Sequence, residues 1–414
     1  MAKKTINKEL TGAQDLYNFL FEACNIIRGP VSQDNFKDYI TPLLYYKRIS
    51  DVYDEETEEA LISSGGDKEY ASLPEQHRFV IPDGCHWQEV RERTENLGAA
   101  IVGAMRQIEI ANPDTLYGVL SMFSSQKWTN KAILNDSKIR DLIEHLSKRK
   151  LGNKDYPADL MGDAYEILLK KFADDSKAQA GEFYTPRSVV RLLVHILDPQ
   201  PGETVYDPAC GSGGMLIEAI RYMHDDSLCC GSIFGQEKNV VNAAIAKMNL
   251  FLHGASDFNV MQGDTLRDPK ILQGGNIAKF DCVIANPPFS LENWGATEWS
   301  SDKYKRNIYG TPSDSCGDYA WIQHMICSMS SGKGRMAVVM PQGILFRGNQ
   351  EAEIRKQLVE SDLIEAVVTL GDKLFYGTGL SPCFLIIRRM KQAHHSGRIL
   401  MIDGSKILRS EEHT

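Results

Sequence analysis

Seven short runs rich in β-branched and aromatic residues follow Gly152, and they constrain the fold more than any other feature of the sequence. Helical patterns separate most of them, and this alternation predicts an α/β fold with a mainly parallel sheet and helices on both faces. The last two runs are joined by a Gly-rich loop without a clear helix, and so short a connection favours an antiparallel last strand. The runs span residues 204–209, 232–237, 258–264, 280–286, 334–341, 363–370 and 383–389.

The first 155 residues have a different hydrophobic pattern, because apolar residues recur there at helical spacing and few runs have the period of a strand. Gly29 and Pro30 end the first helical segment, and Pro42 falls near the start of the second or at a kink in it. The segments span residues 13–29, 36–61, 85–112 and 137–152. We therefore expect an N-terminal helical domain over residues 1–155 and a second domain over residues 156–414.

The composition argues against several kinds of site and partner. The nine cysteines include no Cys-x-x-Cys pair and no neighbouring histidine cluster, which argues against zinc and disulfides and indicates the reduced thiols of a cytoplasm. The N-terminus lacks the apolar run of a signal peptide, and no stretch reaches the ~18 apolar residues of a membrane span. A net charge of −9 makes the whole chain a poor nucleic-acid binder, so contact with DNA must use a partner or local patches. Candidate patches, each as readily a solvated face, are residues 127–150, 303–306 and 388–409.

A glycine-rich turn follows the first strand in VYDPACGSGGMLIEA, residues 205–219. Gly211, Gly213 and Gly214 let the backbone turn tightly and approach a ligand, although a plain strand-to-helix turn would also use them. The Gly-Lys-Ser/Thr of a phosphate loop is absent, and Leu216 stands where a dinucleotide fingerprint needs glycine. Asp207 would repel a phosphate but suits a cationic ligand such as S-adenosylmethionine, which carries an ammonium and a sulfonium.

Two further acids end the next two strands. A carboxylate at Glu237 is placed to accept both hydroxyls of a ribose, and Asp264 is placed to accept from an adenine amino group. Each alone is as readily a solvent-exposed acid at a strand end. Together with the glycine turn, the acids indicate a nucleoside-like ligand at the carboxyl ends of the strands.

The stretch GEFYTPRSVVRLLVHIL, residues 181–197, contains an amphipathic helix. Its start resembles a simple cap, with Thr185 as the N-cap and Pro186 in the first turn. A cap does not require the two aromatic residues that precede it, Phe183 and Tyr184. We expect these rings to close over a bound cofactor.

The most unusual strand end is DCVIANPPFS, residues 281–290. An amino group on an aromatic base is a poor nucleophile, because its lone pair is delocalised into the ring. The side-chain oxygen of Asn286 and the carbonyl oxygen of Pro287 can hold its two N–H bonds and stabilise the charge that develops on the nitrogen. Pro287 and Pro288 fix the direction of that carbonyl, and Phe289 offers a face on which a flat substrate can stack. A turn that merely closes a strand would explain the prolines but neither the amide nor the ring.

A base within duplex DNA would have to be flipped into such a pocket, at a cost of a few kcal/mol. The long polar loop of residues 290–317 follows the motif, and loops of this length are usually functional or disordered. The residues expected to contact nucleic acid, unless the loop is simply disordered, are Trp294, Trp299, Lys303, Lys305 and Arg306.

In combination, the stretches EFYTPRSVVRLL, DPACGSGGM, GQE, GDTL and ANPPF resemble the N6-adenine DNA methyltransferases, in the order of their gamma class. MNLFLHG, DYAWIQHMI and LFYGTGLSPCFLII further resemble the modification (M) subunit of Type I restriction–modification systems, and the resemblance covers nearly the whole chain. It implies a Rossmann-like methyltransferase sheet that uses S-adenosylmethionine, after a helical domain for assembly or for clamping DNA. It also implies a bacterial or archaeal cytoplasmic enzyme.

The resemblance assigns the catalytic motif to Asn286, Pro287, Pro288 and Phe289. It assigns cofactor contacts to Glu182, Phe183, Tyr184, Thr185, Pro186, Arg187, Asp207, Gly211, Ser212, Gly213, Gly214, Glu237 and Asp264, with no metal. The implied partners are a specificity (S) subunit that reads the sequence of double-stranded DNA, a second M subunit and a restriction (R) subunit. An acidic chain fits this division of labour.

Two other functions remain open at the level of sequence. A methyltransferase acting on the N5 amide nitrogen of a protein glutamine would use the same chemistry, although such enzymes usually have Tyr where this chain has Phe289. A non-catalytic assembly subunit would hold the cofactor without turnover. Members of the family usually continue into a helical tail that helps to dock the S subunit, whereas this chain ends at ILRSEEHT, so assembly without further residues is in doubt. The recognition sequence is not encoded in any motif found here.

Overall fold

The computed structural model describes residues 2–116, 118–120, 125–175, 185–223, 232–255, 257–371 and 381–405. The chain folds into two compact units. A helical unit comprises Met1–Ala178 and Lys247–Gly254, and a sheet unit comprises Gln179–Ala246 and Ala255–Thr414. The second segment of the helical unit therefore comes from within the range expected to form the second domain.

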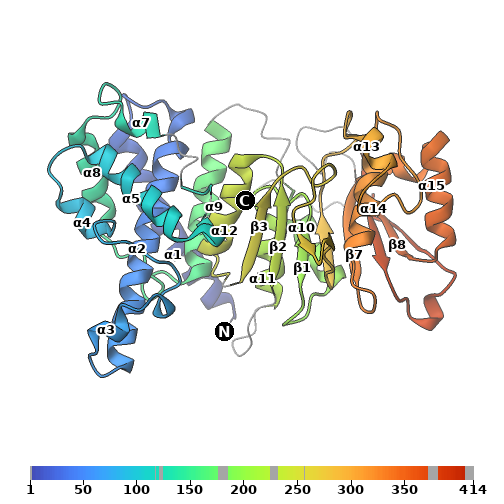
Figure 1. Cartoon of the computed structure of the whole chain (residues 1–414), viewed down its shortest axis with the longest axis horizontal. Helices are drawn as coiled ribbons and strands as arrows, with labels where there is room; N and C mark the ends of the chain where they lie inside the picture. Colours follow the sequence, from blue (N-terminus) through green and yellow to red (C-terminus); the bar gives the residue numbers. More distant parts are fainter. Residues whose placement is uncertain are drawn as a thin grey trace. The chain divides into compact units, whose positions relative to one another are not determined.

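The helical unit is built around two long helices, and Figure 1 shows the short helix α3 beyond the end of α2. Short 3-10 turns at Gln33–Asn35 and Pro74–Gln76 connect some of its elements. Its helices are α1 (Ala2–Ile27), α2 (Lys37–Ser63), α3 (Lys68–Ala71), α4 (Trp87–Glu92), α5 (Leu97–Ala111), α6 (Pro113–Leu116), α7 (Ser125–Thr129), α8 (Asp136–Leu146) and α9 (Ala158–Asp175).

Local sequence explains several of these helix ends. Helix α1 ends before Gly29, whose φ of +104° no helix allows, and Pro42 lies inside the first turns of α2. The segment 85–112, expected as one helix, is divided, because Arg93 is extended after α4 and Asn96 adopts φ +54° before α5. Asp136, at the start of α8, accepts hydrogen bonds from the backbone N–H groups of Asn96 and Leu97 and so stabilises this break.

Phe251, from the returning segment Lys247–Gly254, packs within the core of the helical unit. Its ring centroid lies 5.2 Å from that of Tyr45 and 5.0 Å from that of Phe79, both edge-on. Gly162 of α9 is required nearby, because a Cβ at this position would lie 2.0 Å from the ring of His253. These contacts explain why the end of α12 (Val240–Leu252) packs with helices that lie far before it in the sequence.

The sheet unit contains one sheet of eight strands in the order β10-β8-β9-β7-β6-β1-β2-β3, and Figure 1 shows this succession from β3 to β8. Strand β9 is antiparallel to both of its neighbours, and the other pairings are parallel. A separate hairpin joins β4 (Leu272–Gln273) and β5 (Asn276–Ile277). The strands of the main sheet are β1 (Val205–Asp207), β2 (Ile233–Glu237), β3 (Phe258–Gln262), β6 (Cys282–Ala285), β7 (Arg335–Pro341), β8 (Ile364–Thr369), β9 (Pro382–Arg388) and β10 (Leu400–Asp403).

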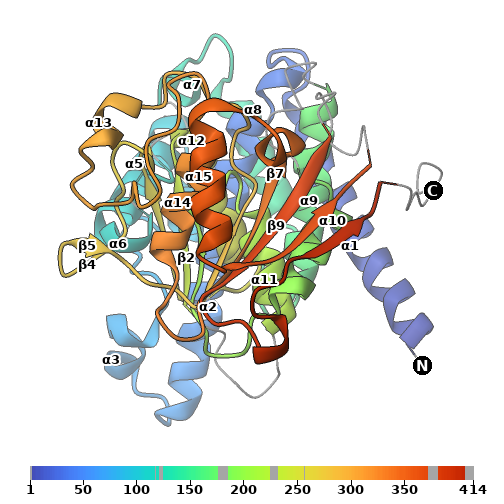
Figure 2. The same ribbon diagram turned by 90° about the vertical axis from the view of Figure 1, so that its right-hand side faces the viewer.

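Helices cover both faces of the sheet, so its central strands are buried along their whole length. Helices α10 and α11 pack together on β1, β2, β6 and β7, whereas α14 packs on β7 from the other face, where Figure 2 also shows α15. Met336, Val338 and Met340 alternate along β7 toward the α14 core, as a period of two requires. The helices are α10 (Arg187–Leu197), α11 (Gly214–Met223), α12 (Val240–Leu252), α13 (Ala296–Ser300), α14 (Asp318–Ser328) and α15 (Asn349–Glu360). Two 3-10 turns, Gln342–Leu345 and Ala393–His395, follow β7 and β9.

The structure confirms the mixed α/β fold, all seven expected strands and the antiparallel course of residues 383–389. That strand is not the last, because β10 follows it and pairs with β8 in parallel. The sequence analysis predicted neither β10 nor the β4–β5 hairpin. Within the described ranges, no helix is both long and apolar enough to cross a membrane.

Candidate active site

Four of the expected site residues end four adjacent strands of the sheet. The register pairs Asp207 of β1 with Gly235 of β2, so Glu237 lies two residues further along β2 than the partner of Asp207. It also pairs Glu237 with Gln262 of β3, so Asp264 lies two residues beyond the partner of Glu237. On the other side of β1, Tyr206 pairs with Val283 of β6. Asn286 therefore lies one strand across and two residues beyond Asp207, with a Cα–Cα separation of about 8 Å.

The strand order reverses at β1, because β2 and β3 follow on one side whereas β6 and β7 follow on the other. In open α/β sheets the crevice at such a reversal is where ligands bind. The residues beyond Asp207 form the expected tight turn, with φ of +53° at Gly211 and +85° at Gly213. A Cβ added to Gly211 or Gly214 would meet no atom within 4 Å, which leaves open space beside the turn.

The carboxylate of Glu237 holds the glycine turn from the neighbouring strand. One oxygen accepts from the backbone N–H of Gly211 at 2.9 Å, and the other accepts from that of Asn239 at 2.7 Å. Each carboxylate oxygen can accept more than one hydrogen bond, so both retain capacity for hydroxyl donors of a ligand. Glu237 thus has a local structural role that the sequence analysis did not predict.

Asp264 follows β3 and forms an ion pair with Lys238, with an Nζ–Oδ2 distance of 2.9 Å. The next residue, Thr265, is buried, and its hydroxyl donates to the carbonyl oxygen of Pro208 at 2.6 Å. This bond ties the loop after β3 to the loop after β1. The fully buried Gln236 of β2 also holds the loop after β3, because its amide accepts from the Lys270 N–H and donates to the Asp268 carbonyl.

Asp207 is a buried carboxyl group that lacks a compensating cation. Its side chain accepts from the backbone N–H of Ala209 at 2.9 Å, and among the described residues no salt bridge reaches it. Burial, and secondarily the nearby charge of Glu237, raise the pKa of Asp207 to about 8 despite that hydrogen bond. A carboxyl group in this condition favours binding of a cation.

The side-chain amide of Asn286 is oriented by Thr185. Its nitrogen donates to the Thr185 hydroxyl at 2.8 Å, whereas its oxygen is buried and has no hydrogen-bond partner among the described residues. Leaving such an acceptor unpaired costs about 1–3 kcal/mol, which a ligand N–H would recover. Thr185 is therefore not the expected N-cap: α10 begins at Arg187, Pro186 occupies the cap position, and no side chain caps the helix.

The other end of the motif is held by Asp318. The backbone N–H of Ser290, which follows Phe289 directly, donates to Asp318 Oδ1 at 2.7 Å. Ser290 adopts φ +49°, a conformation that costs about 1–2 kcal/mol for a residue with a Cβ. A hydrogen bond to a charged acceptor contributes about 1.5–3 kcal/mol, enough to offset that cost.

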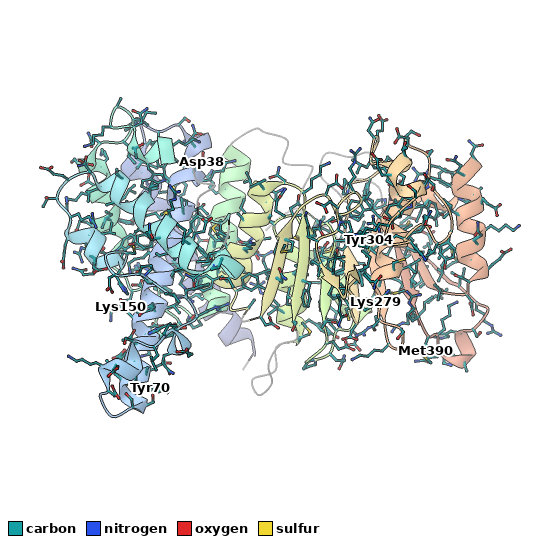
Figure 3. The ribbon with its side chains drawn as sticks, viewed as in Figure 1. Asp38, Tyr70, Lys150, Lys279, Tyr304 and Met390 are labelled. Carbon is teal, nitrogen blue, oxygen red and sulfur yellow. The ribbon has the colours of Figure 1, made fainter. Side chains whose placement is uncertain are left out.

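The loop of residues 290–317 corrects part of the sequence analysis. Trp294 and Trp299 are each 2% exposed and Arg306 is 1% exposed, so these three residues are unavailable for contact with nucleic acid. The exposed cations of the loop are Lys303 and Lys305. In Figure 3, Tyr304 of this loop lies above Lys279, which precedes β6, and above Met390, which follows β9.

Arg306 acts as an internal connector. Its guanidinium donates to the carbonyl oxygens of Thr265 and Leu266 at 2.9 and 2.7 Å, and it pairs with the adjacent Asp302 at 2.7 Å. His324 of α14 accepts from it at 3.2 Å, and the guanidinium carbon lies 4.4 Å from the ring centroid of Trp299. The loop after the Asn286 motif is thereby fixed to the loop that carries Asp264.

Several cations in two of the basic patches pair with neighbouring acids. Within residues 388–409, Arg388 pairs with Glu365 and Lys391 with Asp362. In the range 127–150, cations pair with acids in the combinations Lys127–Asp38, Lys131–Asp136, Lys138–Asp141 and Arg149–Asp15. These contacts favour the interpretation of both patches as solvated faces.

Two further expectations concern what the site would hold. Glu182, Phe183 and Tyr184, expected to close over a cofactor, lie outside the described residues. Across the parts of the chain that are described, no group of three or more Cys, His, Asp or Glu side chains is arranged to hold a metal ion. Sequence reasoning missed the structural roles of Gln236, Thr265, Arg306 and Asp318, because these roles depend on partners distant in the sequence.

Comparison with known proteins places this chain in a family. The family model "N-6 DNA Methylase" matches residues 156–414, and the model "HsdM N-terminal domain" matches residues 16–146. The MjaVII methylase subunit of a Type I restriction enzyme from Methanocaldococcus jannaschii is 34% identical over 389 residues, which cover 89% of this chain. The MjaVIII methylase subunit of the same organism is 33% identical over 424 residues, which cover 96% of this chain.

Solved structures of Type I methyltransferase subunits share the fold of this chain. The Type I restriction–modification methyltransferase subunit of Streptococcus thermophilus superposes with a TM-score of 0.77 at 26% identity, over 95% of this chain and 88% of that one. A modification subunit of a putative Type I restriction enzyme from Vibrio vulnificus, at 22% identity, shares the fold with a TM-score of 0.70 over 97% of this chain and 85% of that one. The matches cover 64% and 69% of the lengths of the two curated relatives from Methanocaldococcus jannaschii. The resemblance seen in the motifs is confirmed: the chain belongs to the N-6 DNA methylase family, among the methylase subunits of Type I restriction enzymes.

Proposed function

We propose that this chain transfers a methyl group from S-adenosylmethionine to N6 of an adenine flipped out of duplex DNA, as the methyltransferase subunit of a Type I restriction–modification complex. The observation that carries the proposal is the buried, unpartnered side-chain oxygen of Asn286, one strand away from the buried carboxyl group of Asp207. Membership of the N-6 DNA methylase family supports it.

The residues around the glycine turn fit the proposed cofactor. Asp207 lacks a cation and suits the ammonium group, and Glu237 retains acceptor capacity for the ribose hydroxyls. The open space beside Gly211 and Gly214 lets a ligand approach the backbone closely. When bound, S-adenosylmethionine supplies a methyl group on a sulfonium that is already a good leaving group. The proposed cofactor contacts are Glu182, Phe183, Tyr184, Thr185, Pro186, Arg187, Asp207, Gly211, Ser212, Gly213, Gly214, Glu237 and Asp264.

Asp264 must share its carboxylate in this arrangement. Lys238 pairs with one of its oxygens, and the backbone N–H of Arg267 donates to the other at 3.3 Å. The side chain of Lys238 is 71% exposed, so it can move aside at little cost when an adenine amino group approaches Asp264.

At the acceptor end, the chain contributes position rather than a base. The Asn286 oxygen and the Pro287 carbonyl accept the two N–H bonds of the adenine amino group and stabilise the positive charge that develops on its nitrogen. Thr185 keeps the amide oxygen, not the nitrogen, available for this bond. Pro288 stiffens the turn, and Phe289 stacks on the flipped base.

The proposed complex contains a specificity subunit that reads the DNA, a second copy of this chain and a restriction subunit. Within it, we assign assembly and clamping of DNA to residues 1–155, and catalysis to residues 156–414, in a bacterial or archaeal cytoplasm. The net charge of −9 gives the isolated chain weak affinity for DNA. We therefore expect little methylation without the specificity subunit.

The deciding experiment is co-expression with the specificity protein encoded beside this chain, followed by mapping of N6-methyladenine in the host DNA. We expect methylation confined to one bipartite sequence. Asn286→Ala should abolish it, because one acceptor of the amino group is lost. Asn307→Ala is a matched control, since that Asn lies in the same unit and, among the described residues, its amide donates to the Ser300 carbonyl alone. Methylation that persists in Asn286→Ala, or a methyl label found on protein instead of DNA, would refute the proposal.

A further inference from the structure

Asp318 is a fully buried carboxylate that joins two loops at the carboxyl edge of the sheet. It is 0% exposed at the first position of α14. One oxygen accepts from the Ser290 N–H at 2.7 Å, and the other is paired with the guanidinium of Arg347. Ser290 belongs to the turn after β6, whereas Arg347 belongs to the segment after β7, the next strand in the sheet.

The turn after β6 offers few backbone N–H donors that could fix it to the fold. Pro287 and Pro288 have no backbone N–H, so two residues of the catalytic motif offer no donor. The Asn286 side chain anchors the start of the turn on Thr185, and the Ser290 N–H anchors its end on Asp318. Phe289 and the Pro287 carbonyl lie between these two anchors, so their positions depend on both.

Arg347 in turn keeps the carboxylate of Asp318 in place. Its Nε lies 2.7 Å from Glu351 Oε2 on α15. Its backbone carbonyl accepts from Arg355 at 2.9 Å, so main chain and side chain are both held by α15. A buried carboxylate needs such a cation, because burying its charge alone would be costly. Helix α15 therefore holds Arg347, Arg347 holds the carboxylate of Asp318, and Asp318 holds the backbone of Ser290.

We propose that Asp318 is a positioning residue for methyl transfer, which acts through Ser290 to fix Phe289 and the Pro287 carbonyl, with Arg347 holding its carboxylate. This role rests on the proposed function, because it presumes that the motif receives a flipped base. It assigns a role in catalysis to two residues outside the Asn-Pro-Pro-Phe motif and outside the cofactor turn.

The test uses the complex of this chain with its specificity subunit. Asp318→Ala should lower kcat by about 10- to 100-fold, the effect of a misplacement of about 1 Å, while the KM for S-adenosylmethionine stays within about twofold. Arg347→Met should lower kcat by about tenfold, or about 1.4 kcal/mol in barrier height. With 2-aminopurine at the target base, both variants should show altered fluorescence of the flipped base, because Phe289 no longer holds it in one stacked position.

Arg388→Met is the matched control, since Arg388 also pairs with a partly buried carboxylate, Glu365, but at the other end of the strands. Its kcat should equal that of the wild type. If Asp318→Ala does not fold, Arg347→Met decides alone, and wild-type kcat in a folded variant would overturn the inference, as would a change in KM only. A wild-type complex that does not methylate DNA would instead refute the proposed function itself. If the wild type is active, Asn286→Ala is inactive and both Asp318→Ala and Arg347→Met keep wild-type activity, only the positioning role is refuted.

Discussion

The amide nitrogen of Asn286 lies 2.8 Å from the hydroxyl oxygen of Thr185, to which it donates a hydrogen bond. The two residues are 101 positions apart in the chain. Thr185 lies two residues before α10, in the stretch proposed to contact the cofactor, and Asn286 begins the motif proposed to receive the base. A single hydrogen bond thus links the two halves of the proposed reaction.

Thr185→Val should lower kcat by about tenfold, because the Asn286 amide loses the acceptor that orients it and can then rotate its nitrogen toward the substrate. Thr185→Ser keeps the hydroxyl and should retain most of the activity. Transfer of labelled methyl groups to DNA by the reconstituted complex measures both. Equal activity of the Val and Ser variants would show that the hydroxyl does not orient the amide.

Donor affinity should depend on pH through Asp207. Because burial raises its pKa to about 8, the carboxyl is protonated in the free protein below that pH and must release a proton to bind an ammonium. The affinity for S-adenosylmethionine should therefore rise as the pH increases from 6 toward about 8, by at most about tenfold per unit. It should fall again once the amino group of the donor loses its own proton near pH ~8.

Isothermal titration calorimetry in two buffers of different ionisation enthalpy checks this directly. Close to one proton should be released per donor bound at about pH 7. Asp207→Asn should bind more weakly and release none. Proton release that is unchanged in this variant would assign the titration to another group.

Arg306→Met should destabilise the sheet unit by about 3–5 kcal/mol, because it leaves buried Asp302 without its cation and two buried carbonyls without their donor. Lys303→Met in the same loop is exposed and should cost about 1 kcal/mol or less. Urea unfolding followed by tryptophan fluorescence suits the comparison, since Arg306 lies against Trp299. Similar midpoints for the two variants would contradict the connecting role of Arg306.

Acid should weaken the sheet unit through Glu203. Burial disfavours its ionised form, but hydrogen bonds from Arg335 and from the Gln200 N–H outweigh this and lower its pKa to about 2. A depressed pKa stabilises the fold above the ordinary value of 4.5, and this stabilisation is lost as the pH falls toward 2. With allowance for screening at Lys333, Glu203→Gln should remove on the order of 1 kcal/mol of the pH dependence of unfolding in that window.

The parts of the fold that could be predicted from sequence are those encoded locally. Strands β1, β6 and β7 are buried on both faces and appear as continuous apolar runs, so the ends of β1 and β6 could be located and place Asp207 and Asn286 at the same edge. Strand β10 escaped prediction because all four of its residues are exposed at the edge of the sheet, which leaves no apolar alternation of a half-buried strand.

Errors in the site have a different physical origin. Arg306 and Trp299 were expected to contact DNA because a polar loop rich in cations and aromatic residues normally lies on the surface. Here the guanidinium is satisfied by carbonyls of residues 265 and 266, a partnership that no local pattern encodes. The same holds for Asp318, whose acidic side chain at the start of a helix would suggest ordinary stabilisation of the helix dipole.

The reversal of strand order at β1 separates the two chemical tasks along the chain. The acids proposed for the donor come from residues 207–264 on one flank, whereas the turn proposed for the acceptor, with its support on α14 and α15, comes from residues 286–355 on the other. Mutations that retune what is methylated can therefore accumulate on one flank while the methyl source stays the same. A sheet organised in this way allows the pocket for the methyl acceptor to change over evolution without the donor site being rebuilt.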